Sequence, residues 1–362
     1  MKGKGLALLS LLLPSFAFGT TPKDVSVKEV PQSHCVTLFP WDLECVNSCS
    51  WLYNPQVEKP NEWQQIDKAL QQHNFHLELS TQFAPETFDK SAKIICANTP
   101  RWFPDDVCAP LLHQLPQSKA ILIVYEPPFH LPVMFTPDTY QCFHKVLTWD
   151  DSIVDNKKFF KINYPALRPM LENIPSYSEK KFLTQICGYF GSWTPDDLYG
   201  ERLNVIRYFE ARPGNDFDFY GRGWPANEYR NYKGAPADKL SVLKNYKFSI
   251  CYENTKNIIG YITEKIFDCF AAGCVPIYWG ATNVKDHIPA NCFIAREDFS
   301  SFDELVDFLK KMDEPTYNQY LQNIRNFLSS EQGEKFSQEA FAKVVLTALE
   351  IPDEPVSNNN SP

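Results

Sequence analysis

From residue 182 onward the sequence alternates short apolar runs with helix-like segments, and this alternation constrains the fold more than any other feature. "FLTQICGYFG" is predicted to be a strand, "YGERLNVIRYFEAR" a helix, and "DFDFYGRGW" a strand that ends in a glycine-rich turn. "ADKLSVLKNY", "KFSICYEN", "YITEKIFDCFAA" and "CVPIYWG" continue the series as helix, strand, helix and strand. Such alternation predicts an α/β domain built on a mainly parallel sheet.

A similar but weaker series lies in the first half of the chain. "NEWQQIDKALQQH" carries apolar residues at helical spacing, and "KIICAN" and "APLLHQL" are short apolar runs. "KAILIVYEPP" is predicted to be a buried strand that stops at Pro127 and Pro128. Residues 161–181 contain several prolines and little periodicity, which is typical of a linker.

Together these patterns predict two α/β domains joined by a linker, with a ligand cleft between them. The pattern from 302 to 349 is helical, and the tail "PDEPVSNNNSP" is predicted to be disordered. The predicted parts are an N-terminal domain at 20–165, a linker at 166–181, a C-terminal domain at 182–350 and a tail at 351–362.

Residues 1–19 have the pattern of an export signal. Lys2 and Lys4 precede an apolar stretch that ends in the small-residue cleavage signal "AFG". A signal peptide fits this pattern, because the apolar stretch is short for a membrane span. A short signal anchor is the alternative, and it would tether the protein to a membrane. Either one predicts an exported or secretory-pathway protein, in a Golgi-type lumen if it is anchored.

Composition narrows the class of protein and of partner. A hydrophobic content of 44% and a charged content of 22% describe a folded globular protein. The formal net charge of -9 argues against a nucleic-acid-binding protein, because no broad basic field exists to attract a polyanion.

The eleven cysteines identify no disulfide framework, since their number is odd and their spacing is scattered. Export would permit disulfides. Cys35, Cys45 and Cys49 crowd the N-terminal part and are the best candidates for a bridge. Cysteines within apolar runs are instead predicted to be buried thiols. These are Cys251, Cys269 and Cys274.

The stretch "GYITEKIFDCFAAGCVPIYWG" places an acid beside a base at the start of an apolar helix. The hydroxyl of Thr263 is predicted to cap this helix. Lys265 is unfavourable at a helix N-terminus, so it indicates an anionic ligand nearby, and Glu264 would accept hydrogen bonds from ligand hydroxyls. Glu253 and Asn254 follow a predicted strand, at the edge where ligands of open α/β sheets bind. The alternative is a capped helix with two solvated charges.

Two more charged residues lie where they could face a ligand. Arg202 lies near the start of the helix in "YGERLNVIRYFEAR", and its guanidinium matches phosphate oxygens bidentately. Glu126 lies where a buried strand meets two prolines, so its carboxylate could act as a general base. The alternatives are a surface ion pair for Arg202 and a solvated turn for Glu126.

The segment "KFSICYENTKNIIGYITEKIFDCFAAGCVPIYWGA" resembles the signature of the family 10 glycosyltransferases, the α-1,3/4-fucosyltransferases. That signature combines an aromatic strand, Glu-Asn, a Tyr-x-Thr-Glu-Lys step, a helix, and a Gly-x-x-Pro strand. The resemblance extends from about Cys187 to Leu328. It is fainter in the N-terminal half, where "VYEPP" and "KVLTWDDSIVDNKKFFKINYP" look like the acceptor-side Glu-Pro segment and its following strand.

This resemblance implies a GT-B architecture, in which two Rossmann-like domains face a central cleft and the C-terminal one holds GDP-fucose. Glu126 would be the general base that deprotonates the acceptor hydroxyl. Two cations would neutralise the diphosphate of the donor, and other residues would contact its fucose or ribose. The implied cations are Arg202 and Lys265, the implied sugar contacts are Glu264 and Tyr261, and Glu253 and Asn254 would also line the donor site.

The expected activity is an inverting, metal-independent transfer of fucose from GDP-fucose to a glycan hydroxyl, with an α-1,3 linkage to N-acetylglucosamine. No cofactor is expected, because two fixed cations can stabilise a leaving diphosphate. The expected partners are GDP-fucose and an oligosaccharide or glycoconjugate acceptor, without nucleic acid. The alternatives are a related glycosyltransferase with another nucleotide-sugar donor and a catalytically silent glycan-binding protein on the same scaffold.

Two apparent metal motifs are expected to be structural. Asp216 and Asp218 spell an acidic triplet with Phe217, but strand alternation places one aspartate inside and the other outside. His73 and His76 are expected to lie at a helix end without a carboxylate or cysteine partner, so a zinc site is not expected.

Overall fold

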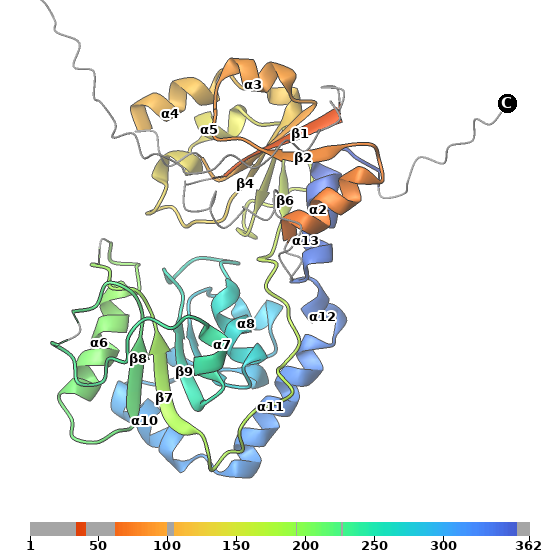
Figure 1. Ribbon diagram of the computed structural model, residues 1–362. Coiled ribbons are helices and arrows are strands. Elements are labelled where there is room, and N and C mark those ends of the chain that lie inside the picture. Colours follow the sequence, from red (N-terminus) through yellow and green to blue (C-terminus); the bar gives the residue numbers. More distant parts are fainter. Residues whose placement is uncertain (1–33, 41–61, 100–104, 193, 226, 353–362) are drawn as a thin grey trace, which may run out of the picture. The chain divides into compact units, whose positions relative to one another are not determined.

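The computed structural model describes residues 34–40, 62–99, 105–192, 194–225 and 227–352 (Figure 1). The predicted export signal at 1–19 lies outside the described residues, as do Cys45, Cys49 and most of the predicted tail. Within the part of the chain that is described, no helix combines the length and the apolar character needed to cross a bilayer.

The first sheet has six strands, and every neighbouring pair is parallel. Parallel sheets are covered on both faces, and the strand "AILI" at residues 120–123 is accordingly buried at every position. In sheet order the strands are β2 (His76–Leu79), β1 (Cys35–Phe39), β3 (Lys93–Ala97), β4 (Ala120–Ile123), β5 (Lys145–Thr148) and β6 (Phe159–Lys161).

The second sheet has five strands and is also parallel throughout. In sheet order they are β11 (Ile294–Ala295), β10 (Val275–Trp279), β9 (Tyr246–Tyr252), β7 (Lys181–Ile186) and β8 (Phe217–Tyr220). Two parallel sheets connected by helices confirm the predicted α/β class. The strands β4, β7, β8, β9 and β10 lie in predicted segments, whereas β1, β2 and β11 were not predicted.

Helices connect most of the parallel strands, whereas β5 and β6 are joined by a loop at 149–158. Those before residue 150 are α2 (Glu62–Gln71), α3 (Pro85–Lys90), α4 (Asp105–Leu112) and α5 (Pro137–Gln141). Those after it are α6 (Tyr199–Glu210), α7 (Lys239–Leu243), α8 (Glu264–Ala271), α9 (Val284–His287), α10 (Phe302–Lys311), α11 (Glu314–Leu328), α12 (Glu331–Glu334) and α13 (Gln338–Ala348). Short 3-10 turns lie at Gln117–Lys119, Pro132–Phe135, Ala290–Cys292 and Arg296–Asp298.

The first sheet has a core on each face. Ile95 of β3 packs with one cluster, whereas its neighbours Ile94 and Cys96 pack with the other, as strand alternation dictates. α13 joins the cluster that contains Ile95, through residues that include Phe341 and Val345. Figure 1 shows α13 beside α2. The sequence placed everything up to residue 350 in the C-terminal domain, but this last helix packs with the first sheet.

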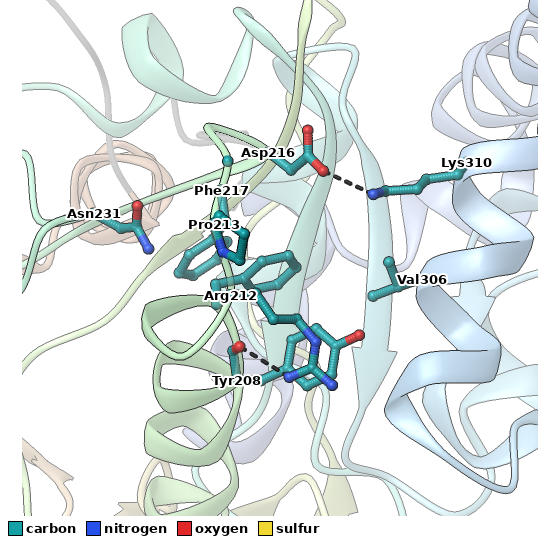
Figure 2. Close-up of a pocket in the computed structure, with 10 residues that line it drawn as sticks. Tyr208, Arg212, Pro213, Asp216, Phe217, Asn231, Val306 and Lys310 are labelled. Carbon is teal, nitrogen blue, oxygen red and sulfur yellow. Dashed lines mark hydrogen bonds and ion pairs between the residues drawn. The ribbon is translucent and has the colours of Figure 1, made fainter.

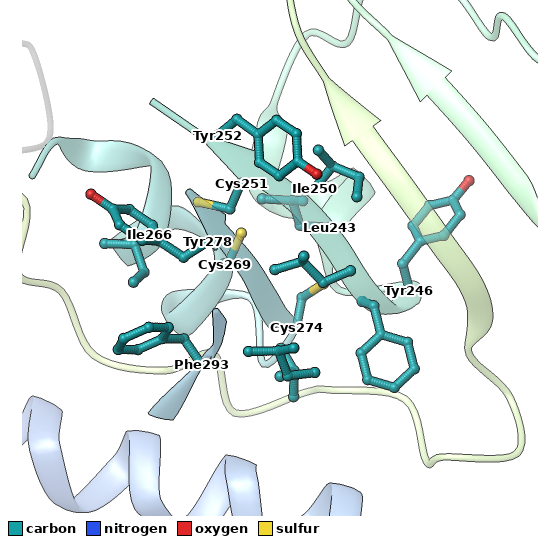
Figure 3. Packing of buried hydrophobic residues seen from close by; sticks show 14 of the residues in the cluster. Leu243, Tyr246, Ile250, Cys251, Tyr252, Ile266, Cys269, Cys274, Tyr278 and Phe293 are labelled. Atoms are coloured by element: carbon teal, nitrogen blue, oxygen red, sulfur yellow. The ribbon is translucent and has the colours of Figure 1, made fainter. Parts of the chain in front are cut away.

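The second sheet has one large core. Its residues come from both faces of the strands and from the helices between them. Figure 3 shows part of this cluster, with Cys251, Cys269 and Cys274 among aromatic and branched side chains. The three cysteines are free and buried, which confirms that prediction. Cys35 is also a free, buried thiol, so it is not the bridge residue that its position suggested.

Candidate active site

A cavity of about 910 Å³ lies at the carboxyl ends of strands from both sheets. The first sheet contributes three residues that follow β4 or β6, and the second sheet contributes the rest. Those from the first sheet are Glu126, His130 and Tyr164. Carboxyl ends of parallel strands are where α/β proteins bind ligands, so the cavity has the position expected of an active site.

The start of α8 forms the charged side of this cavity, and Glu253 lies beneath it. Glu253 has no exposed surface. Its Oε1 accepts a hydrogen bond of 2.8 Å from the backbone nitrogen of Thr263, and its Oε2 accepts one of 2.7 Å from the Thr263 hydroxyl. Nζ of Lys265 lies 3.1 Å from Oε2. Both oxygens of this buried carboxylate are therefore used within the protein.

This arrangement corrects two predictions. Thr263 stands at the N-cap position of α8, but its hydroxyl makes no hydrogen bond to the helix backbone. That hydroxyl donates to Glu253 and accepts from Lys265 instead. Glu253 was expected to line the donor site, yet it is absent from the lining of the cavity because α8 covers it. The acid that supports the helix start thus comes from the preceding strand.

Close packing fixes Glu253 from the side of β10 as well. A Cβ atom added at Gly280 would lie 2.5 Å from Cγ of Glu253, which is shorter than any normal contact. Glycine at this position lets the backbone approach the buried carboxylate. The final glycine of the sequence stretch that contains Glu264 and Lys265 therefore belongs to the same structural unit.

Lys265 lies between two carboxylates and retains a partly exposed side chain. Its exposed fraction is 24%, and Nζ lies 3.9 Å from Glu264 as well as close to Glu253. Burial alone would lower the pKa of Lys265, but the two carboxylates outweigh it and raise the pKa. A permanent cation therefore faces the cavity, as the sequence indicated.

Glu264 is the more exposed acid of the pair, with 39% of its side chain accessible. Burial opposes its ionisation, but Lys265 and Lys239 outweigh burial and lower the pKa of Glu264 to about 2. Lys239 lies in the first turn of α7, with Nζ 3.5 Å from Glu264 and 3.3 Å from Asp268. An ionised carboxylate flanked by two ammonium groups thus borders the cavity.

Arg202 is buried and lies in the first turn of α6. It donates to the backbone oxygen of Tyr252 at 2.7 Å and to Oδ1 of Asn254 at 3.1 Å, both at the carboxyl end of β9. Its guanidinium carbon lies 5.0 Å from the centre of the Tyr199 ring, within range of a cation–π contact. Arg202 and Asn254 both line the cavity, where the sequence predicted them.

On the first-sheet side, the carboxylate of Glu126 forms a hydrogen-bonded chain. Its Oε2 lies 2.7 Å from Nδ1 of His130, and Nε2 of the same ring lies 2.9 Å from the hydroxyl of Tyr199. The exposed fractions of Glu126 and His130 are 17% and 13%. The cavity therefore brings Glu126 together with the predicted residues of the second sheet, through a histidine that the sequence analysis missed.

Tyr261 closes one side of the cavity. It is 1% exposed, and its ring packs edge-on against Trp149 at 5.0 Å and Tyr164 at 6.2 Å between ring centres. Burial raises the pKa of its hydroxyl well above the usual range, so it remains protonated. Tyr261 reaches the cavity lining, as predicted, but most of its surface serves packing.

Several lining residues were not singled out from the sequence. Lys239 is a cation in a helix first turn, the same signal that identified Lys265, so the sequence did contain the means to find it. Arg222 lies within the predicted glycine-rich turn, between Gly221 and Gly223, which both have positive φ. His130 and Tyr199 carried no such signal.

The two aspartates of the acidic triplet, Asp216 and Asp218, lie on opposite sides of the surface as predicted, with Asp216 exposed and Asp218 buried. Figure 2 shows Asp216 directed towards Lys310, and their charged atoms lie 2.8 Å apart beside a small pocket of about 70 Å³. Asp218 is buried and pairs with Lys181 at 2.9 Å and Lys233 at 3.3 Å. Each aspartate thus has its own cationic partner.

One group among the described residues has ligand atoms close enough for a metal ion, namely Cys35, His76 and Glu78, all within 4.8 Å. None of them lines the cavity. The Cys35 thiol donates to Glu78 at 3.1 Å, and burial with this bond raises the pKa of the thiol to about 12. His76 was expected to have no cysteine or carboxylate partner, but the parallel pairing of β1 and β2 places it opposite Cys35, in the same group as Glu78.

Residues 186–347 match the family described as "Glycosyltransferase family 10 (fucosyltransferase) C-term". An α-(1,3)-fucosyltransferase of Helicobacter pylori is 41% identical over 73 residues, which are 20% of this chain and 15% of that protein. The human 4-galactosyl-N-acetylglucosaminide 3-α-L-fucosyltransferase 9 is 30% identical over 202 residues, or 55% of this chain and 50% of that protein. The chain thus spans about half, or less, of the length of these relatives.

A crystal structure of an α1,3-fucosyltransferase with GDP-fucose superposes with a TM-score of 0.53 and 17% sequence identity, and covers 94% of this chain and 96% of that one. At this identity the superposition shows the fold alone. Both sheets have counterparts in a structure of the GT-B type, which confirms the predicted fold class.

Proposed function

We propose that this protein, whose residues 186–347 match the C-terminal domain of glycosyltransferase family 10, transfers fucose from GDP-fucose to a glycan hydroxyl. One observation carries the proposal. A single cavity is lined by a carboxylate from the first sheet and by Arg202 and Lys265 from the second. A base on one side and cations on the other are what such a transfer needs.

The cationic side would hold the donor. The Lys265 ammonium, the Arg202 guanidinium and the start of α8 offer charge and hydrogen-bond donors to the two phosphates. Glu253 holds Lys265 in place from below, so the cation is fixed before a ligand arrives. Glu264 and Tyr261 would contact the sugar or ribose hydroxyls, and Asn254 would contribute through its bond to Arg202.

Glu126 would act on the acceptor. Its carboxylate would take the proton of the acceptor hydroxyl while that oxygen bonds to C1 of fucose, and the bond from C1 to the GDP oxygen breaks with its electron pair leaving on GDP. Attack opposite the leaving group inverts the configuration at C1. Positioning and electrostatics would supply most of the rate, as in glycoside hydrolysis with a sugar hydroxyl replacing water.

We further propose that the reaction is independent of a divalent metal. The support is the fixed pair of cations on the diphosphate side, which supplies the charge that a metal would otherwise provide. N-acetylglucosamine is the proposed acceptor sugar, with transfer to its 3-position, because the relatives include α-1,3-fucosyltransferases. The proposed location is a secretory or exported compartment, on the strength of the sequence pattern of residues 1–19.

In the decisive experiment, the purified protein is incubated with GDP-fucose, GDP-mannose or a UDP-sugar. Each donor is tested with and without an N-acetyllactosamine acceptor, and with and without EDTA. Acceptor-dependent GDP release and a fucosylated product support the proposal. Turnover with another nucleotide sugar would indicate a related glycosyltransferase. Binding of the acceptor without any turnover would indicate a glycan-binding protein, and loss of activity in EDTA would contradict metal independence.

A further inference from the structure

His130 and Tyr199 connect Glu126 to the cationic side of the cavity. His130 lies four residues after Glu126, across a turn formed by Pro127 and Pro128, and its backbone nitrogen bonds to the oxygen of Pro127 at 3.0 Å. The ring then bridges Glu126 and Tyr199 through its two nitrogens. The histidine ring and the Tyr199 ring lie nearly parallel, with 16° between their planes.

The hydrogen-bond chemistry permits one protonation pattern of neutral His130. An ionised Glu126 can only accept, so the proton of the neutral ring must sit on Nδ1. Nε2 is then an acceptor, and the Tyr199 hydroxyl must donate to it. Burial raises the pKa of this hydroxyl to about 12, so the tyrosine has the proton to give. Each group in the chain thus has the proton that its neighbour needs.

Glu126 is held at its backbone as well. Asn98 is fully buried with a positive φ, and its Oδ1 accepts from the backbone nitrogens of Tyr125 at 2.7 Å and Glu126 at 3.3 Å. The backbone and one carboxylate oxygen of Glu126 are therefore both fixed, in a residue that lines the cavity. A general base needs this geometry, because it must present one lone pair to the proton that it removes.

Resting on the fucosyl transfer proposed above, we infer that His130 is a positioning residue for Glu126 and that Tyr199 fixes the ring tautomer that His130 needs. Tyr199 belongs to α6 and also packs against Arg202, so the base is set by a residue of the donor-binding side. Positioning of the base and formation of the donor site are thereby coupled through one tyrosine hydroxyl.

The test combines His130→Ala, His130→Gln, Tyr199→Phe and the double variant His130→Gln/Tyr199→Phe in the fucosyl-transfer assay. The side-chain amide of glutamine can donate to Glu126 without any tautomer to fix. His130→Ala should lower kcat about tenfold or more, which is the cost of a hydrogen bond to a charged group, with the KM for GDP-fucose within about twofold of the native value. His130→Gln should restore much of that loss.

Tyr199→Phe keeps the ring against Arg202 and removes only the hydroxyl. In the native background it should lower kcat about threefold to tenfold, the effect of one neutral hydrogen bond. In the His130→Gln background it should have no further effect, because glutamine needs no tautomer. Equal losses in both backgrounds, or an alanine variant with native kcat, would overturn the inference.

A second measurement needs no turnover. The ¹⁵N shifts of the His130 ring, assigned among the seven histidines by their loss in His130→Gln, report which nitrogen carries the proton. The native protein should show the proton on Nδ1, and Tyr199→Phe should show a mixture of ring forms. A proton on Nε2 in the native protein would contradict the inference even if fucosyl transfer is confirmed. If transfer itself fails while Nδ1 is protonated, the proposed function is wrong and the hydrogen-bonded chain stands.

Discussion

The two sides of the cavity hold their charges in opposite ways. On the second-sheet side, Lys265 of α8 forms an ion pair with the fully buried Glu253, which directly follows β9. On the first-sheet side, Glu126 has a histidine partner, and that histidine in turn contacts a hydroxyl from the second-sheet side. A fixed ion pair suits charge stabilisation, whereas a base must remain free to take a proton.

The largest effect is expected from Glu126→Gln, which removes the base on the first-sheet side. Removing the base should lower kcat by about 10² to 10⁴ while leaving GDP-fucose binding unchanged, because general base catalysis accounts for a factor of that size. Steady-state kinetics give kcat, and calorimetric titration with GDP-fucose gives Kd. Full activity in this variant would show that another group removes the proton.

Lys265→Ala should act on binding and on stability together. It removes a cation from the proposed diphosphate site, so Kd for GDP-fucose should rise about a hundredfold, the loss of two charge-assisted hydrogen bonds. It also leaves the buried Glu253 carboxylate without its cation, so the unfolding temperature should fall. Lys285→Ala is the control, because it removes an exposed ammonium whose partner, Asp298, is also exposed and which has no contact with Glu253. An equal loss of stability in both variants would contradict the role given to Glu253.

Gly280→Ala tests the packing of the fixed side without touching a charge. The new methyl group would overlap Cγ of Glu253, and overpacking of this kind costs about 1–3 kcal/mol. Urea unfolding should show this loss. Gly214→Ala is a useful control for glycine loss, because a Cβ there meets nothing within 4 Å, although its φ of +122° adds backbone strain. A variant at Gly280 as stable as the native protein would mean that Glu253 can move away from residue 280 at no cost.

The smallest expected effect is the pH dependence contributed by Glu264. Its pKa is lowered to about 2 in the folded protein, so its pairing with Lys265 and Lys239 stabilises the fold above the unfolded pKa of about 4.3. That contribution should be lost as the pH falls from there towards 2. Urea unfolding of the native protein and of Glu264→Gln across this range measures it. Identical pH profiles for the two proteins would show that the pairing is screened by solvent.

Much of the fold was predictable because strand and helix periodicities are local. The predicted helix start at α8 placed Glu264 and Lys265 at the carboxyl edge of one sheet, and the strand "KAILIVYEPP" placed Glu126 at the carboxyl edge of the other. Ligands of parallel sheets bind at these edges. Lys239 was missed although it obeys the rule that identified Lys265. The Asp238 side chain caps α7, which marks Lys239 as a first-turn cation.

The remaining errors come from contacts between distant parts of the sequence. His130 and Tyr199 are 69 residues apart, and no local pattern pairs them. Glu253 appeared to face the ligand because strand position does not reveal that Thr263 and Lys265 fold over it. The pattern of α13 indicates an amphipathic helix, but it does not say which sheet its apolar face will cover.

The position of α13 also bears on how the protein is made. Phe341, Val345 and their neighbours complete the core on one face of the first sheet, whose strands are synthesised much earlier. During translation α2 can cover part of that face early, but the contribution of α13 is missing until residues 338–348 leave the ribosome. The core of the half translated first is therefore completed only after the strands of the second sheet have been synthesised.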